Sequence, residues 1–161
     1  MRKECKMDKE FEEKCLNKRT VILEATESRI LEKKVMELIA GQHKSSSAYF
    51  LECAKNLSQS STPLAAVLIG HFAMEHKANE VIALYGYKME SHVCTQIALS
   101  RIVGRKDLSK KLSDIFTLRQ SVGYRMNLKQ NEESKIEAEK TITSIIIPFF
   151  EEINKLISEM K

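Results

Sequence analysis

Glycine and proline are scarce in this sequence, with five Gly and two Pro among 161 residues. A chain built mainly from β-strands needs many turn residues, and these two residue types supply a large share of them. Between these residues, apolar side chains recur at intervals of three and four, which is the spacing of one helix face. The sequence therefore predicts an all-α fold, an antiparallel up-and-down bundle of four to five main helices.

Glycines and capping residues divide the chain into predicted helices. The first is expected over about 18–40 with Gly41 as its end, and a short second helix is expected after the serine cluster at 45–47. The pair Thr62-Pro63 is typical of a helix start. Further helices are predicted over about 63–85, 91–103, 108–122 and 132–159. Pro148 lies inside the last of these and should kink or split it.

The chain also divides by composition into two expected parts. Residues 1–44 hold a charged N-terminal segment and an extra helix, and residues 45–161 hold the bundle proper. The helix over 63–85 is apolar on nearly all sides from Leu64 to Met74, so it should be the central helix.

Location and redox state follow from what the sequence lacks. No apolar run reaches the roughly 18 residues of a membrane span, and the charged segment Met1 to Lys9 is unlike a signal peptide. We therefore expect a cytoplasmic protein with no membrane partner. The four cysteines show no paired spacing, so we expect reduced thiols rather than a disulfide framework or a zinc site. They are Cys5, Cys15, Cys53 and Cys94.

Positive charge is concentrated in one stretch of the chain. Residues 101–129 contain eight Lys or Arg and only two acids, a net charge of +6. Such a concentration is typical of a surface that binds a phosphate-bearing partner. The alternative is a solvated helix face with extra lysines.

One of these cations lies where an apolar residue should be. On a helical wheel of residues 108–122, Arg119 falls within the stripe of four apolar residues that should face the core. They are Leu108, Leu112, Ile115 and Val122. Burial of an arginine is costly unless it is paired, and arginine does not give up its charge. Arg119 should therefore meet a carboxylate, line a cleft or face another subunit, unless its stem lies on apolar surface with the head in water.

The central helix carries two polar residues on its own apolar stripe. His71 and Glu75 are four residues apart, so their side chains are neighbours. We expect Glu75 to pair with Arg119, with His71 close by. The alternative is that backbone groups or water satisfy each of them separately.

Neither a metal nor a cofactor is expected. His71 and His76 are five residues apart and point to different sides of the helix, whereas a two-histidine zinc helix needs a spacing of four. The Glu-x-x-His pattern of di-iron bundles and glycine-rich phosphate loops are also absent from the sequence. His92, which follows Ser91, is either a surface residue of a first helical turn or part of a cleft.

The stretch from Tyr49 to about Ile157 resembles the HEPN superfamily, and most closely its small prokaryotic stand-alone members. The matching features, in order, are a short helix, an apolar helix with a His-Phe-Ala-Met stretch that ends in Leu84-Tyr85-Gly86, the pair Ser91-His92, a helix that ends in Leu118 to Tyr124, and a long C-terminal helix.

The resemblance implies a homodimer with a cleft at its seam. In ribonuclease members of the family, an arginine followed after four to six residues by a histidine cuts RNA without a metal. Arg119 matches the arginine, but Tyr124 stands at the histidine position, and tyrosine is a poor base near neutral pH because its pKa is about 10. Other members pair with a nucleotidyltransferase in toxin–antitoxin systems, and Met126 stands where the modified tyrosine would be.

Three functions are therefore expected, in this order. The first is a catalytically silent or weak HEPN-like protein that binds RNA, a nucleotide or a partner protein through a basic cleft around Arg119. His71, Glu75, Arg125, Asn127 and Lys129 would belong to that cleft. The second is a metal-independent endoribonuclease of toxin–antitoxin or defence type, with Tyr124 or His92 in proton transfer. The third is a structural interaction bundle in which Arg119 only stabilises the fold.

Overall fold

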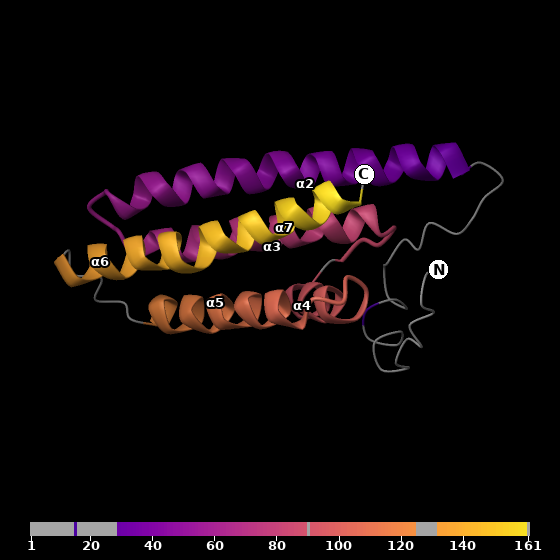
Figure 1. Cartoon of the computed structure of the whole chain (residues 1–161). Coiled ribbons are helices and arrows are strands. Elements are labelled where there is room, and N and C mark those ends of the chain that lie inside the picture. The colour runs from indigo at the N-terminus through magenta and orange to yellow at the C-terminus, as the bar shows by residue number, and fades with distance from the viewer. Residues whose placement is uncertain (1–14, 16–28, 90, 125–131, 161) are drawn as a thin grey trace.

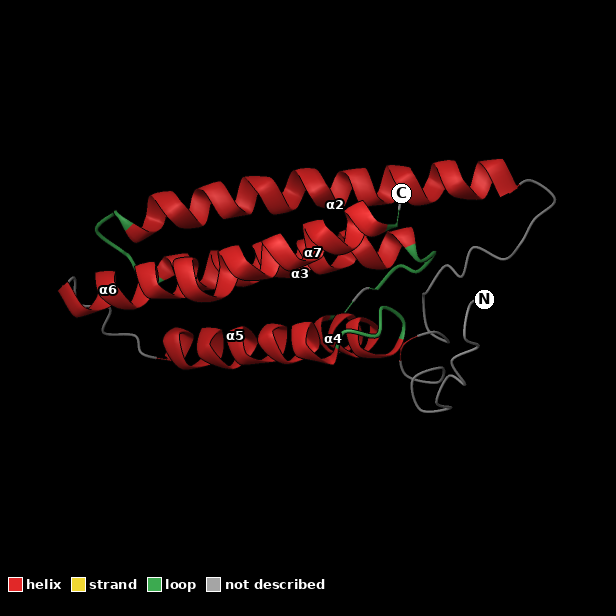
Figure 2. Ribbon diagram, viewed as in Figure 1, coloured by secondary structure: helices red, strands yellow, loops and turns green. Residues whose placement is uncertain are grey.

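The computed structural model describes residues 15, 29–89, 91–124 and 132–160, and Figure 1 shows the arrangement of its helices. Figure 2 shows that this part of the chain contains helices and loops but no strand. The elements are α2 (Arg29–Ser58), α3 (Ala65–Leu84), α4 (His92–Arg101), α5 (Lys106–Tyr124), α6 (Glu132–Thr141), the π-helical turn η2 (Ile142–Ile146) and α7 (Ile147–Glu159). The predicted all-α fold is confirmed.

Helix α3 is the centre of the bundle, as its apolar sequence predicted. It packs against α2, α4, α5, η2 and α7, and thirteen of its twenty residues are buried. In Figure 1, α2 and the α6–α7 rod run alongside α3, while α5 forms a further layer. Apolar as α3 is, none of the helices in the described ranges has the combination of length and hydropathy that crossing a membrane requires.

The prediction of two helices separated at Gly41 is wrong, because one helix, α2, covers both. The helix is continuous from Arg29 to Ser58. The serine hydroxyls bond to carbonyls of the same helix, Ser45 Oγ to Gly41 O at 3.1 Å and Ser47 Oγ to Lys44 O at 2.8 Å. Serines with such bonds do not start a new helix, and one interior glycine costs only about 1 kcal/mol. The predicted boundary between residues 44 and 45 therefore falls inside α2.

Most other helix ends agree with their sequence signals. Gly86 and Gly104 adopt φ angles of +90° and +79°, the left-handed conformation that glycine favours at helix ends. Ser91 caps α4, since its Oγ accepts a hydrogen bond from Cys94 N at 3.1 Å. Helix α3 begins at Ala65, later than predicted, because a tight turn precedes it in which Ala65 N donates to the Thr62 carbonyl.

The last helix was predicted to kink or split at Pro148, but α6, η2 and α7 follow one another without a loop, and only the hydrogen-bonding pattern changes. Proline has no N–H to donate, so the carbonyl four residues earlier loses its helical partner. A π-helical turn covers residues 142–146, and Ile147 separates it from the proline. Ile146 of this turn packs so closely on α3 that a methyl group at Gly70 would overlap its Cδ1 atom.

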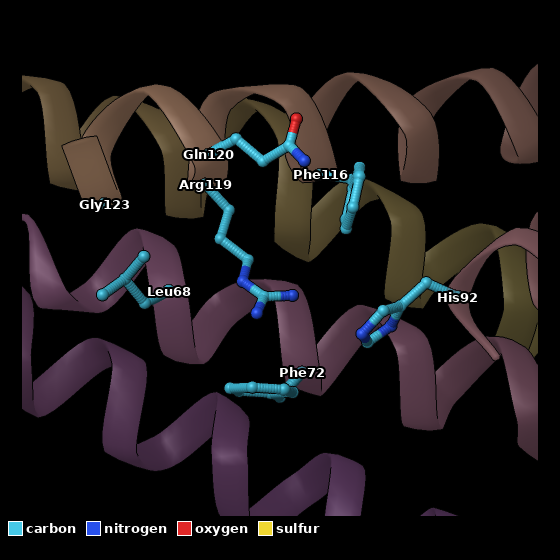
Figure 3. Close-up of a pocket in the computed structure, with 7 residues that line it drawn as sticks. All are labelled: Leu68, Phe72, His92, Phe116, Arg119, Gln120 and Gly123. Carbon is cyan, nitrogen blue, oxygen red and sulfur yellow. The ribbon is translucent and has the colours of Figure 1, made fainter. Parts of the chain in front are cut away.

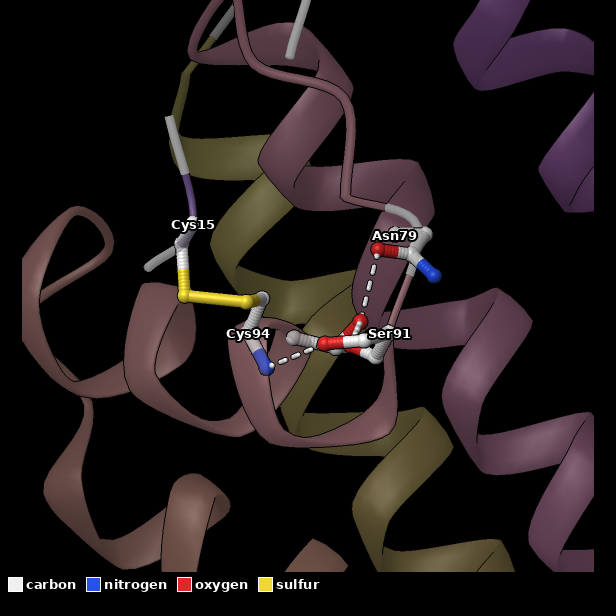
Figure 4. Close-up of a disulfide and its surroundings, with 5 residues drawn as sticks. Cys15, Asn79, Ser91 and Cys94 are labelled. Atoms are coloured by element: carbon white, nitrogen blue, oxygen red, sulfur yellow. Dashed lines mark hydrogen bonds between the residues drawn. A yellow bond between two sulfur atoms is a disulfide. The ribbon is translucent and has the colours of Figure 1, made fainter. Parts of the chain in front are cut away.

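A disulfide between Cys15 and Cys94 corrects the expectation of reduced thiols (Figure 4). The two Cα atoms are 5.5 Å apart although the residues are separated by 79 positions. Sequence spacing could not reveal the pair because only the fold brings α4 beside residue 15. Cys53 is a free thiol, and Cys5 lies outside the described residues.

Candidate functional site

A pocket of about 490 Å³ lies where α3, α4 and α5 meet (Figure 3). Helix α3 contributes its floor, α5 its opposite wall, and the first residue of α4 closes one side. The lining residues are Leu68, Phe72, His92, Phe116, Arg119, Gln120 and Gly123. The pocket therefore combines two aromatic rings with one permanent cation, one imidazole and one amide.

Arg119 extends from α5 toward α3, so the prediction of an inward guanidinium is confirmed (Figure 3). Its Nη1 atom lies 3.4 Å from Nδ1 of His71. The guanidinium carbon is 5.1 Å from the ring centre of Phe72 and 5.8 Å from that of Phe116. Aromatic faces attract such a cation by their quadrupole, so the rings stabilise a charge that arginine cannot lose.

The expected pairing of Glu75 with Arg119 is wrong. Glu75 Oε2 instead lies 2.6 Å from Nδ1 of His92, and the ion pairs of the described residues include none for Arg119. The distance is that of an ion pair, although the ring nitrogen is not aligned for a hydrogen bond. His92 reaches Glu75 because Ser91 starts α4 directly before it. His92 is therefore part of a cleft, which was one of its two expected placements.

His71 is fully buried between Arg119 and His92. Burial, then the charge of Arg119, then His92 lower the pKa of His71 from 6.5 to about 3, so its ring is neutral at pH 7. Arginine can only donate, so Nδ1 accepts from Arg119 and the ring proton is on Nε2. That Nε2 atom has no hydrogen-bond partner among the described residues.

The basic stretch 101–129 is partly neutralised within the fold. Arg105 bonds to Asp107 and Glu152, and Lys110 bonds to Asp114 at 2.6 Å. Within the described part of this stretch, Arg119 is the cation that lines the pocket.

The remaining predicted site residues are not placed by the structure. Arg125, Asn127 and Lys129 lie outside the described residues. Tyr124 is the last residue of α5, and the position of its side chain is likewise outside the description.

Several pocket residues were missed by the sequence analysis. Phe116 lies three residues before Arg119 on α5, and Phe72 lies three residues before Glu75 on α3, so helical spacing from the predicted residues could have indicated both. Gln120 offered no such signal, because an exposed amide beside an arginine is common on any helix. The half-buried pair His43 and His76, with Nδ1 atoms 2.9 Å apart, was also missed because its members belong to α2 and α3.

Comparison with known proteins adds no relative: no family model, no curated protein and no solved structure matches the chain. The resemblance to the HEPN superfamily therefore stays a prediction.

Proposed function

We propose that this chain is a HEPN-like helical protein that binds the phosphate group of an RNA or a nucleotide in the Arg119 pocket. The observation that carries the proposal is the guanidinium itself: it lines a cavity and, among the described residues, has no carboxylate partner. A cation that is always charged and is not neutralised by the protein is suited to a phosphate oxygen.

The rest of the pocket suits the remainder of a nucleotide. Phe72 and Phe116 lie on two sides of the guanidinium and offer ring faces, and a base stacked on an aromatic ring contributes about 1–3 kcal/mol. Gln120 offers one acceptor and two donors for a base edge. Such a pocket favours a single-stranded segment, whose bases are free to leave a stack.

The sequence also left open a structural role for Arg119 and a protein partner, and each of these requires something different of the pocket. A structural role for Arg119 alone would need neither a cavity nor an unneutralised charge. A protein partner, such as the nucleotidyltransferase that the family resemblance implies, would occupy the pocket with an acidic side chain in place of a phosphate.

A binding titration tests the proposal. Arg119→Gln should weaken the binding of a labelled single-stranded RNA at least tenfold in fluorescence polarisation, and should reduce the dependence of binding on salt concentration. Lys110→Gln is the matched control, because Lys110 is on the same helix but pairs with Asp114. Equal binding by wild type and Arg119→Gln would refute the proposal, provided that both variants show the wild-type helical content.

A second function, metal-independent RNA cleavage, is favoured by one observation: His92 and Arg119 line the same pocket, and His92 contacts the carboxylate of Glu75. A carboxylate beside Nδ1 would keep the ring proton on that nitrogen once the two groups align, and the other nitrogen would then be free to accept a proton. Arg119 would stabilise the charge that develops on the phosphate.

Cleavage has its own test. Labelled RNA incubated with the protein in a chelator should be cut by wild type and at least a hundredfold more slowly by His92→Gln. RNA that is bound but remains intact would reject the nuclease and keep the binding function.

A further inference from the structure

Three potential metal-binding side chains meet beside the Arg119 pocket. His71 and Glu75 are one turn apart on α3, and His92 begins α4. One ligand atom from each lies within 4.8 Å of those of the other two. The rings of His71 and His92 have centres 5.1 Å apart, so both imidazoles border the same small space as the carboxylate.

One nitrogen atom of this cluster has unmet bonding capacity. Nε2 of His71, in a fully buried side chain, has no hydrogen-bond partner in the described structure. A buried polar atom without a partner costs about 1–3 kcal/mol. Nδ1 of His92 makes no aligned hydrogen bond but lies 2.6 Å from the carboxylate of Glu75. A cation bound between the three side chains would give Nε2 of His71 a partner and would join the other two ligands.

We infer that His71, Glu75 and His92 bind a divalent first-row transition metal ion, of which Zn²⁺ is the simplest probe. Two imidazoles and one carboxylate are a ligand set that zinc and iron(II) accept, with further positions left for water or substrate. Mg²⁺ and Ca²⁺ prefer oxygen ligands and should bind poorly. His76, the other histidine of α3, lies outside this cluster, and the second imidazole comes from His92 of α4.

The cluster needs a small adjustment to hold an ion. Glu75 Oε2 and His92 Nδ1 are 2.6 Å apart, whereas two ligands at about 2.0–2.1 Å from a tetrahedral ion lie roughly 3.3 Å from each other. The side chain of His92 is 37% exposed and that of Glu75 is 16% exposed. His92 therefore has room to rotate while α3 holds the other two ligands.

Arg119 competes with the metal through His71. Coordination at Nε2 requires the ring proton to move to Nδ1, and Nδ1 then no longer accepts a bond from Arg119. The positive charge of the guanidinium also opposes a nearby divalent ion. Metal binding should therefore break the contact between Arg119 and His71 and release the guanidinium to the pocket.

The experiment uses the full chain, stripped of metal with a chelator and dialysed. Calorimetric titration with Zn²⁺ should give one equivalent of saturable binding, and Co²⁺ should give the visible absorption bands of a coordinated ion. Glu75→Gln and His92→Gln should each weaken Zn²⁺ binding at least tenfold. Both positions are partly exposed, so these variants should fold, which circular dichroism checks.

The His43–His76 pair provides the matched control. A double variant, His43→Gln with His76→Gln, should keep the full equivalent of Zn²⁺, because neither residue belongs to the cluster. Loss of binding in this double variant, or unchanged binding in both Glu75→Gln and His92→Gln, would overturn the assignment. Absence of saturable Zn²⁺ and Co²⁺ binding would overturn it as well.

Arg119→Gln separates this inference from the proposed function. The variant should bind Zn²⁺ more tightly because the competing contact and the charge are gone, while its RNA binding should fall. RNA binding without metal binding would reject the metal site and leave the proposed function standing. Metal binding without RNA binding would do the reverse. Unchanged Zn²⁺ affinity in Arg119→Gln would refute the competition through His71.

Discussion

The imidazoles of His43 and His76 share a half-buried contact between α2 and α3, where Phe50 stacks on His76 at a ring separation of 5.4 Å. Burial, then the neighbouring His76, then Lys88 lower the pKa of His43 from 6.5 to about 4. The pKa of His76 is also lowered, by burial. Between pH 6.5 and about pH 4, the folded state therefore binds fewer protons than the unfolded state. The contribution of His43 to stability is complete above pH 6.5 and is lost as the pH falls toward 4.

This contact predicts a pH-dependent melting temperature. Between pH 7 and pH 5 the melting temperature of the wild type should fall. The fall should be about 2–4 °C for each kcal/mol by which the free energy of unfolding decreases. His43→Gln should show a shallower dependence over the same range, because one group that must be protonated is missing. Thermal unfolding followed by circular dichroism measures both slopes, and parallel curves for the two proteins would contradict the assignment.

At the scale of single residues, the sequence located Arg119 but not its neighbours. A helical wheel shows which face of α5 a residue belongs to, and that face was correct. It does not show which side chain on another helix lies opposite. Glu75 therefore has His92 as its partner, which depends on how the turn after Gly86 directs α4, and Arg119 has His71 and two phenylalanine rings.

At the scale of elements, the contact between α3 and η2 depends on the absence of a side chain at one position. Gly70 is buried, and Ile146 Cδ1 occupies the volume that a methyl group there would need. Ile146 belongs to the π-helical turn η2, so the fit between α3 and this turn depends on Gly70 and Ile146 together.

Gly70→Ala should therefore destabilise the protein, although alanine is the better helix former. Overpacking of a core costs about 1–3 kcal/mol, so the urea midpoint should fall. Gly41→Ala is the control, because nothing lies within 4 Å of a methyl group at that exposed position of α2. It should stabilise the helix by about 0.5–1 kcal/mol. A Gly70→Ala variant as stable as the wild type would show that Ile146 can move aside.

Helix ends were predictable where a residue either adopts a positive φ angle or caps the helix with its side chain. Gly86 and Gly104 have positive φ angles, and Ser91 caps α4. Gly41 carried the same sequence signal without a positive φ, so α2 continues through it. The signal of a glycine is ambiguous because only tertiary packing, here of α2 along α3, decides whether the chain turns.

At the scale of the whole molecule, the disulfide between Cys15 and Cys94 connects the N-terminal region to the helix that carries His92. A crosslink of this span restricts the unfolded chain, and native disulfides typically contribute about 2–4 kcal/mol. Thr95 of α4 donates a hydrogen bond to Asn79 of α3 at 3.3 Å, so α4 is joined both to Cys15 and to the central helix.

Reduction should therefore lower the melting temperature of the wild type by several degrees. Cys94→Ser should match the reduced wild type and should not respond to a reducing agent. Cys53→Ser, which removes the free thiol, should retain the response. A wild type with the same melting temperature in reducing and oxidising buffer would show that the crosslink contributes nothing to stability.

The all-helical class and the central position of α3 could be predicted because they follow from apolar spacing along one segment at a time. The disulfide, the pair His43–His76 and the cluster around His92 could not, since each joins segments that are distant in the sequence. Composition places charge in the stretch 101–129, but only the fold shows that Arg105 and Lys110 are neutralised there while Arg119 is not.

The bond between Cys15 and Cys94 makes the chain between them a covalent ring that contains α2 and α3. A protease that cuts once in the exposed turn between these helices, near Ser61 and Thr62, would open the ring without releasing a fragment. The disulfide would keep the fragment that carries α2 tethered to α4, and the nicked protein would migrate as two pieces only on a reducing gel. The packing of α2 along α3 would thus survive a break in the backbone.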